Sequence, residues 1–203
     1  PGAVAGWMTL HERFGKLPLE EVMAPAIRYA EEGYPVTPNI SRLWQEAFEN
    51  YSKYRDRPEF QGWFDTFAPN NTWLKPGEMF RCPDMAKTLK EIAATKGEAF
   101  YRGAIAEKID AFFKKHNGFL TKEDLAAFKP EWVDPISVNY HGVDVWELPP
   151  NGHGITVLMA LQILKDMNLA ERDCADTMHK QIEAMKLAMV DTAEYVAEPS
   201  FMR

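Results

Sequence analysis

Apolar residues recur at helical spacing through most of the first 130 positions of the chain. The pattern predicts helices over about residues 7–14, 22–30, 37–54, 85–93, 100–116 and 121–128. Gly15 and Gly33 end the first two, while Thr37 and Thr121 suit the N-terminal caps of the third and the last. Residues 57–83 have no sustained period and are rich in Pro, Gly, Asn and aromatic residues. We expect them to form a long surface loop with room for one short strand.

Near Ile136 the pattern changes to an alternation of apolar and polar residues around the pair His141-Gly142. This alternation predicts a two-stranded β-hairpin over residues 136–148. The sequence PPNGHG at 149–154 then turns the chain into an apolar helix that ends at about Met167. A last helix is predicted from Asp173, with Asp176 as an alternative cap, to about residue 196. Its apolar positions are Met178, Ile182, Met185, Met189 and Ala193.

These elements predict an α+β fold that is predominantly α-helical. We expect residues 1–203 to form a single domain, mostly helical in 1–130 and built from the hairpin and two helices in 131–203. Surface scaling for a domain of this size predicts about 9,700 Å² exposed after folding against about 33,600 Å² unfolded, so about 70% of the surface would be buried.

Composition and charge exclude several classes of protein. Hydrophobic residues at 46% and charged residues at 26% are typical of a soluble folded chain, and exclude a disordered, collagen-like or coiled-coil one. A net charge of −7, without a cluster of Lys and Arg, argues against nucleic acid as a partner. No apolar run reaches the roughly 20 residues of a membrane span. The two cysteines, Cys82 and Cys174, are expected to be buried thiols, since their spacing fits neither a disulfide framework nor a zinc site.

The residues alone show no catalytic constellation. Ser41, Ser52, Ser137 and Ser200 lack the neighbouring base and the strained turn that a nucleophilic serine needs. The glycine turn at 152–154 precedes a helix, whose free N–H groups could hold an anion or a carboxylate; a plain strand-to-helix turn is the alternative. None of the five histidines has a setting typical of catalysis, and His116 suits the C-terminus of a helix.

Two further groups have both a functional and a structural interpretation. His179 and Glu183 are four residues apart on a predicted helix, with Asp176 one turn earlier, and such a face can hold a metal ion. A solvated helix face explains the same residues better, so we expect neither a metal nor a cofactor. The aromatic residues Trp63, Phe64, Phe67 and Trp73 could line a sugar or peptide groove, but such side chains more often pin a loop to the protein.

Short motifs along nearly the whole chain resemble the large subunit of gamma-glutamyltranspeptidases, in the family's order. They are PGAVAGW at 1–7, FGKLP at 14–18, APAI at 24–27, AEEGYPV at 30–36, AFYRG at 99–103, GFLT at 118–121, EDLAAF at 123–128, PIS at 135–137, YHG at 140–142, PP at 149–150, EAMKLA at 183–188 and PSF at 199–201. Each motif is weak alone, but together they cover the sequence from end to end.

The resemblance implies a segment of an N-terminal nucleophile (Ntn) hydrolase with the αββα fold. Such an enzyme is made as one precursor that cuts itself before a threonine, and the new terminal threonine attacks a γ-glutamyl amide, such as that of glutathione. By the resemblance, that threonine and the oxyanion glycines lie in the small subunit, and a carboxylate-binding arginine lies upstream of Pro1. The partner of this chain is therefore expected to be the remainder of its own precursor. The parent would be periplasmic or secreted, with a cytoplasmic location left open.

No catalytic residue is assigned within this chain, and the chain alone is expected to be inactive. The candidates for reaching substrate are Asn151 and His153. The turn that holds them reads Asn-Gly-His-Gly, where the family usually has a serine- and glycine-rich version, and it is more similar to cephalosporin-acylase-like relatives. Thr192 stands where an arginine is common after the aspartate at 191. The acyl group therefore remains open between γ-glutamyl and related acyl groups.

Two other hypotheses remain open on the sequence. One is a free-standing helical module that binds a peptide or protein through the aromatic residues of 63–73. The other is an independent metal hydrolase that uses His179 and Glu183. A fragment of a larger enzyme should differ from both by exposing apolar surface where its partner belongs.

Overall fold

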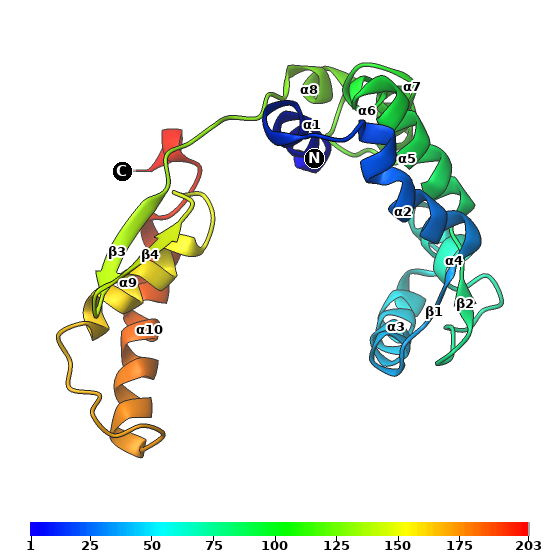
Figure 1. Ribbon diagram of the computed structural model, residues 1–203. Helices are drawn as coiled ribbons and strands as arrows, with labels where there is room; N and C mark the ends of the chain where they lie inside the picture. Colours follow the sequence, from blue (N-terminus) through cyan, green and yellow to red (C-terminus); the bar gives the residue numbers. More distant parts are fainter. Residues whose placement is uncertain (203) are drawn as a thin grey trace. The chain divides into compact units, whose positions relative to one another are not determined.

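The computed structural model describes residues 1–202, which form two compact units (Figure 1). The first unit is Pro1–Pro130 and the second begins at Glu131. This boundary lies where the sequence changes from helical periodicity to the hairpin and its two helices. The predicted class, α+β and predominantly helical, is confirmed. That the two units make up one domain stays a prediction.

Two glycines end the first two helices, as predicted. Helix α1 is Ala3–Phe14 and helix α2 is Leu19–Glu32. At Gly15 a Cβ atom would lie 2.4 Å from the carbonyl oxygen of His11, and Gly33 has a φ of +90°, so glycine is needed at both positions.

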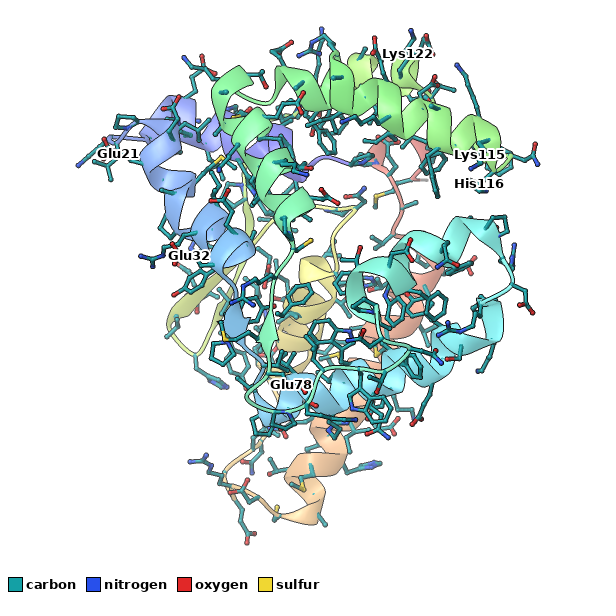
Figure 2. The ribbon with its side chains drawn as sticks, turned by 90° about the vertical axis from the view of Figure 1, so that its right-hand side faces the viewer. Glu21, Glu32, Glu78, Lys115, His116 and Lys122 are labelled. Atoms are coloured by element: carbon teal, nitrogen blue, oxygen red, sulfur yellow. The ribbon has the colours of Figure 1, made fainter. Side chains whose placement is uncertain are left out.

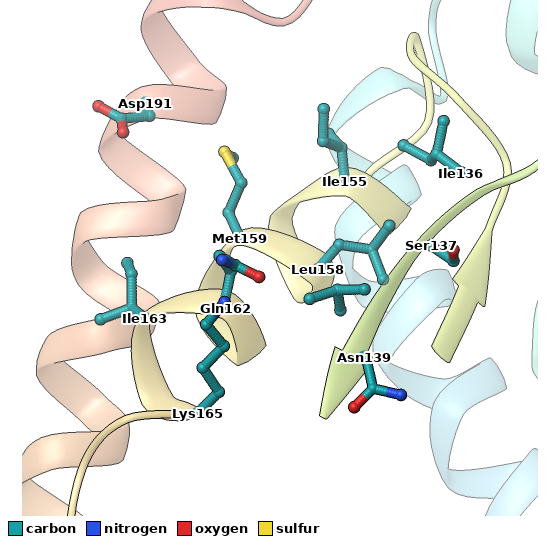
Figure 3. A pocket seen from close by; sticks show the side chains of 11 residues that line it. Ile136, Ser137, Asn139, Ile155, Leu158, Met159, Gln162, Ile163, Lys165 and Asp191 are labelled. Carbon is teal, nitrogen blue, oxygen red and sulfur yellow. The ribbon is translucent and has the colours of Figure 1, made fainter. Parts of the chain in front are cut away.

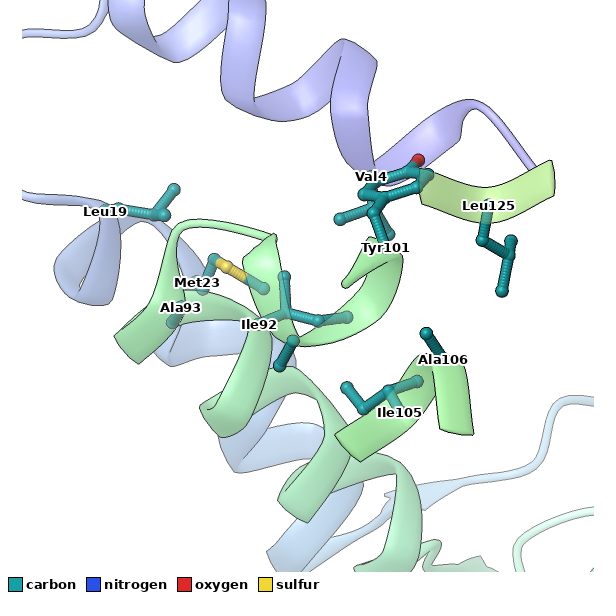
Figure 4. Close-up of a cluster of buried hydrophobic side chains, with 10 residues drawn as sticks. Val4, Leu19, Met23, Ile92, Ala93, Tyr101, Ile105, Ala106 and Leu125 are labelled. Carbon is teal, nitrogen blue, oxygen red and sulfur yellow. The ribbon is translucent and has the colours of Figure 1, made fainter. Parts of the chain in front are cut away.

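A buried apolar cluster holds the first unit together (Figure 4). It joins α1 and α2 to four helices, which are α5 (Pro83–Thr95), α6 (Glu98–Tyr101), α7 (Ala104–Lys115) and α8 (Lys122–Ala127). Its largest fully buried member is Leu125 of α8, which is 1% exposed. The Tyr101 hydroxyl adds a polar contact to α1, because it accepts from the N–H of Ala5 at 2.9 Å and donates to the carbonyl of Pro1 at 2.8 Å.

The prediction of one continuous helix over 100–116 is wrong. The structure has two helices there, α6 and α7, separated by Arg102 and Gly103. A Cβ atom at Gly103 would lie 2.8 Å from the Cα of Ala99, so the break depends on a close backbone approach that apolar periodicity does not reveal.

Side-chain caps fix the starts of two helices where the sequence predicts them. Helix α3 is Pro38–Tyr51, and the hydroxyl of its cap Thr37 accepts from the N–H of Ile40 at 3.4 Å. The α-helix ends three residues before the predicted end at 54, and a short 3-10 helix, η1 (Ser52–Tyr54), continues to that residue. At α8 the Thr121 hydroxyl accepts from the N–H of Asp124 at 3.2 Å, and the carboxylate of Asp124 accepts from the N–H of Thr121 at 2.9 Å. This is a complete capping box.

The Asp124 carboxylate makes the first unit less stable at acid pH. The hydroxyl of Thr121 and then its N–H donate to this carboxylate and hold the pKa of Asp124 below its ordinary value. The stabilisation is therefore complete above the pKa of an unfolded aspartate and is lost as the pH falls below about 4. In Asp124→Asn we expect a shallower loss of stability between about pH 5 and 2, measured by urea unfolding. An unchanged acid slope in the variant would contradict this role.

The expectation of an irregular loop over 57–83 is wrong for its first part. It contains a short 3-10 helix, η2 (Pro58–Phe60), and a helix, α4 (Gln61–Phe67), and only its end holds a strand, β2 (Met79–Phe80). This strand pairs antiparallel with β1 (Tyr34–Pro35). The α4 helix forms because its aromatic side chains pack on α3, with Trp63 at 4.6 Å from Tyr51 and Phe67 at 5.7 Å from Trp44 between ring centroids.

The second unit begins with the predicted hairpin. Strand β3 (Ile136–Tyr140) pairs antiparallel with β4 (Val143–Glu147), and the turn residues His141 and Gly142 have φ of 51° and 86°. Helix α9 (Gly154–Leu164) packs on both strands, and helix α10 (Ala175–Tyr195) packs on α9. A last 3-10 helix, η3, is Pro199–Phe201.

The start of α10 differs from the prediction. Its cap is Cys174, rather than Asp173 or Asp176, because the sulfur of Cys174 accepts from the N–H of Thr177 at 3.4 Å. This bond lowers the pKa of the Cys174 thiol. Cys174 and Cys82 are both half-buried, so the expectation of two buried thiols is wrong.

The face by which α10 packs also differs from the apolar stripe in its sequence. The buried residues of α10 are small: Thr177, Ala184, Ala188 and Thr192. Small side chains let the α9 backbone approach closely, and the longer side chains are left outside. We name the exposed set the α10 stripe: Met178 (52% exposed), Ile182 (59%), Met185 (38%) and Met189 (59%).

Each unit leaves large apolar side chains exposed, among them Leu10 (52%) in the first and Val190 (65%) in the second. The buried fraction of about 70% expected for one compact domain of this size stays a prediction. Within the described part of the chain, every helix is too short or too polar to cross a membrane.

Candidate functional site

The turn between β4 and α9 presents Asn151 and His153 to solvent. His153 occupies the N-cap position of α9 without a side-chain hydrogen bond to the helix, so its imidazole is not used for capping. The N–H of Thr156 donates to the carbonyl of His153 at 3.0 Å and closes the first helical turn. Both candidate residues therefore lie at the positive end of an α-helix, with side chains free to contact another molecule.

Gly154 allows Glu147 to approach the start of α9. A Cβ atom at Gly154 would lie 2.6 Å from Oε2 and 2.8 Å from Cβ of Glu147. A carboxylate beside a helix N-terminus is electrostatically favourable. The end of β4 and the start of α9 therefore lie in close contact on the strand side of the turn.

A groove lies under this turn, between the first turn of α9 and the C-terminal half of α10. Its volume is about 510 Å³. The polar residues that line it are Asn151, His153, Thr156 and Thr192, and the apolar ones are Val157, Met185, Met189, Ala193 and Val196. The structure thus brings both sequence candidates to one cavity, together with two threonines.

The two threonines form a buried hydrogen bond between the helices. Their Oγ1 atoms are 2.7 Å apart, and Thr192 Oγ1 also donates to the carbonyl of Ala188 at 2.7 Å. Thr156 is 7% and Thr192 is 6% exposed. Sequence patterns gave little sign of this pair: Thr156 was visible only as a polar residue in a nearly all-apolar helix, and Thr192 only as a departure from the family pattern.

A second cavity, of about 600 Å³, lies on the other side of α9 (Figure 3). Ile136, Ser137 and Asn139 of β3 line one side, and Leu158, Met159 and other residues of α9 line the rest, with Asp191 of α10. Among the described residues, β3 pairs only with β4, so its other edge borders this cavity. Its lining combines apolar side chains of β3 and α9 with the polar residues Ser137, Asn139, Gln162, Lys165 and Asp191.

The residues considered for a metal site do not come together as one. Glu183 forms an ion pair with Lys186 at 2.7 Å, and His179 is exposed. In the part of the chain that the structure describes, no group of three or more His, Cys, Asp or Glu side chains could hold a metal ion. His116 lies at the C-terminal end of α7 (Figure 2). Its ring packs on that of Phe112, with 4.6 Å between ring centroids, as expected of a structural histidine.

The serines and the aromatic residues also have structural roles. Ser41 and Ser52 donate to main-chain carbonyls, each at 2.7 Å. Phe64 is 2% exposed, and the half-buried rings of Trp63, Phe67 and Trp73 contact other aromatic rings of the first unit. These contacts match the interpretation in which the aromatic residues pin their segment to the protein.

Comparisons with known proteins agree with the arrangement of the elements. The sequence profile of the Gamma-glutamyltranspeptidase family matches residues 1–203. A crystal structure of a cephalosporin acylase from Bacillus halodurans superposes with a TM-score of 0.96 at 52% identity, over 100% of this chain and 38% of that chain. The gamma-glutamyltranspeptidase of Helicobacter pylori superposes with a TM-score of 0.88 at 29% identity, over 100% of this chain and 57% of that one.

A curated relative gives the same result. The glutathione hydrolase proenzyme of Pseudomonas aeruginosa is 32% identical over 208 residues, which is 100% of this chain and 36% of the relative. The fold is thus a segment of the Ntn hydrolase class. The chain belongs to the gamma-glutamyltranspeptidase family, a family of enzymes, and spans about a third of the length of this relative.

Proposed function

We propose that this chain is part of the large subunit of an Ntn amide hydrolase or transferase, and that the rest of the same precursor supplies the nucleophilic threonine. The threonine hydroxyl would attack the amide carbon of a γ-glutamyl or related acyl donor, and the amine would leave with a proton. Water or an amine would then cleave the resulting ester. The match to a cephalosporin acylase over the full chain, at 52% identity, carries this proposal.

The contribution of this chain would be to pack against the nucleophile-bearing part and to form one wall of the substrate pocket. Asn151 and His153 are the side chains proposed to reach substrate, because they are exposed and share one groove. The groove offers hydrogen-bonding groups at the turn and apolar surface along α10, which is a setting for binding rather than for nucleophilic attack.

The α10 stripe would face the remainder of the precursor, and at Met185 and Met189 this contact would close one side of the groove. The P. aeruginosa relative is named a proenzyme, and this chain corresponds to 36% of its length. Four large apolar side chains on one helix side are an unusual surface for a monomer, and their burial would favour association.

A second candidate for the acyl group has its own support. The Asn-Gly-His-Gly turn is similar to acylase-type relatives, and identity to the cephalosporin acylase is 52% against 29% to the H. pylori enzyme. An acylase-type parent would accept a related acyl group in place of γ-glutamyl. Glutaryl and γ-glutamyl anilides differ only in the α-amino group, so comparing the two separates the candidates.

The test uses the intact precursor that contains these residues. We expect it to hydrolyse at least one of the two anilides, and the 203-residue chain alone to release no more aniline than buffer. In the precursor, Asn151→Ala and His153→Ala should each raise KM at least threefold, as expected for the loss of about one hydrogen bond. His179→Ala, also an exposed histidine of the second unit, is the matched control and should leave KM unchanged. Hydrolysis by the isolated chain, or inertness of the precursor toward both anilides, would contradict the proposal.

A further inference from the structure

A short series of hydrogen bonds connects the candidate turn to α10. The carbonyl of His153 accepts from the N–H of Thr156, and the Thr156 hydroxyl lies 2.7 Å from the hydroxyl of Thr192. Thr192 is held in turn by its bond to the carbonyl of Ala188 at 2.7 Å. The turn is therefore linked to the C-terminal half of α10 through two threonines.

The direction of these bonds follows from the number of protons. A threonine hydroxyl has one proton, and that of Thr192 goes to the carbonyl of Ala188. Thr156 must then donate to Thr192 Oγ1. This arrangement gives Thr192 the role of acceptor, which no apolar side chain of the same shape can fill.

Burial makes this single bond a positional constraint. Both residues are more than nine-tenths buried, so few other groups can replace either partner. A buried donor without an acceptor is costly, so the first turn of α9 is held where Thr156 meets Thr192. On the strand side, the contact of Gly154 with Glu147 limits the same segment.

We propose that Thr192 is a positioning residue, which acts through Thr156 to fix the turn so that Asn151 and His153 face the groove. The proposal rests on the proposed function, in which these two side chains reach substrate. Thr192 itself lines the groove and does not take part in the chemistry.

The test is a set of substitutions in the intact precursor. Thr192→Val keeps the shape but removes the acceptor, and should raise KM for the anilide substrate by about threefold to tenfold with a smaller change in kcat, the range expected for one hydrogen bond. Thr192→Ser keeps the hydroxyl and should restore KM. Thr156→Val removes the donor, and the double variant should be no worse than Thr192→Val alone, because the two residues form one interaction.

Thr177→Val is the matched control on the same helix. Thr177 is 6% exposed, and its hydroxyl donates to the carbonyl of Glu171 at 2.6 Å, far along α10 from the turn. Its replacement should lower stability to a similar degree and leave KM unchanged. If Thr177→Val raises KM as much as Thr192→Val does, the effect is one of general stability and the proposal is wrong.

Amide hydrogen exchange of the peptide covering residues 148–158 tests the positioning without relying on activity. We expect faster exchange in Thr192→Val, but not in Thr192→Ser or Thr177→Val. If Asn151→Ala and His153→Ala leave KM unchanged, the proposed role of the turn fails, yet exchange still reports on the threonine pair. If those two variants raise KM while Thr192→Val alters neither KM nor exchange, the positioning role is overturned.

Discussion

Replacing Ile182 and Met189 by lysine should prevent the precursor from maturing. Both side chains belong to the α10 stripe and are 59% exposed in this chain. If the rest of the precursor covers the stripe, each replacement removes about 1.5–3 kcal/mol of apolar burial and brings a charge into an apolar contact. We expect the double variant to yield at least tenfold less processed enzyme, measured as the ratio of cleaved to uncleaved precursor on a gel.

In the isolated chain, we expect the same two substitutions to leave the fold intact. Lysine on an exposed stripe should lower the fluorescence of a dye that binds apolar surface and leave the helical circular dichroism signal unchanged. Gln181→Lys and Glu194→Lys, at exposed polar positions of α10, serve as controls and should affect neither processing nor dye binding. Normal maturation of the Ile182→Lys, Met189→Lys precursor would show that the stripe is not an interface.

The second large effect is expected at Leu125. This side chain is 1% exposed and lies in the apolar cluster that joins α8 to the other helices of the first unit. Leu125→Ala should lower the free energy of unfolding by about 2–5 kcal/mol, because it removes buried methyl groups and leaves a cavity. Urea unfolding followed by circular dichroism measures this change.

The matched control is Phe119→Ala, six residues earlier. Phe119 is 97% exposed, so its loss should change the free energy of unfolding of the isolated chain by less than about 0.5 kcal/mol. Equal midpoints for the Leu125→Ala variant and the unaltered chain would mean that α8 is not part of the cooperative core.

Local signals in the sequence predicted the element boundaries that caps, glycines and the hairpin turn define. The caps at Thr37 and Thr121, the glycine at 33 and the hairpin turn at 141–142 depend only on residues a few positions apart. Such features depend on residues close together in the sequence, so the sequence alone predicts them.

Features that depend on distant contacts were missed. Helix α4 forms because Trp63 and Phe67 pack on α3, which is far away in the sequence. Propensity does not encode such packing. Two other misses are local: the break at Gly103 depends on the backbone of Ala99 four residues earlier, and the cap at Cys174 uses a sulfur acceptor where an aspartate oxygen is usual.

The candidate site shows the same division. The glycine-rich turn is a local feature, and the sequence alone indicated its residues Asn151 and His153 as candidates. The bond between Thr156 and Thr192 joins residues 36 positions apart and exists only because α9 and α10 pack through small side chains. The large apolar residues of α10 lie on an exposed face, whereas the face packed on α9 carries small residues. The apolar pattern therefore indicated the wrong face of α10 as the buried one.

The contact between Glu147 and Gly154 also restricts how the chain can vary over evolution. A Cβ atom at 154 would lie 2.8 Å from the Cβ of Glu147, an atom that every residue except glycine possesses. Shortening the side chain at 147 would not relieve that overlap; only glycine at 147 or a shift of the strand end would. Replacing Gly154 therefore requires the end of β4 to move. The residues acceptable at 147 and at 154 thus depend on each other.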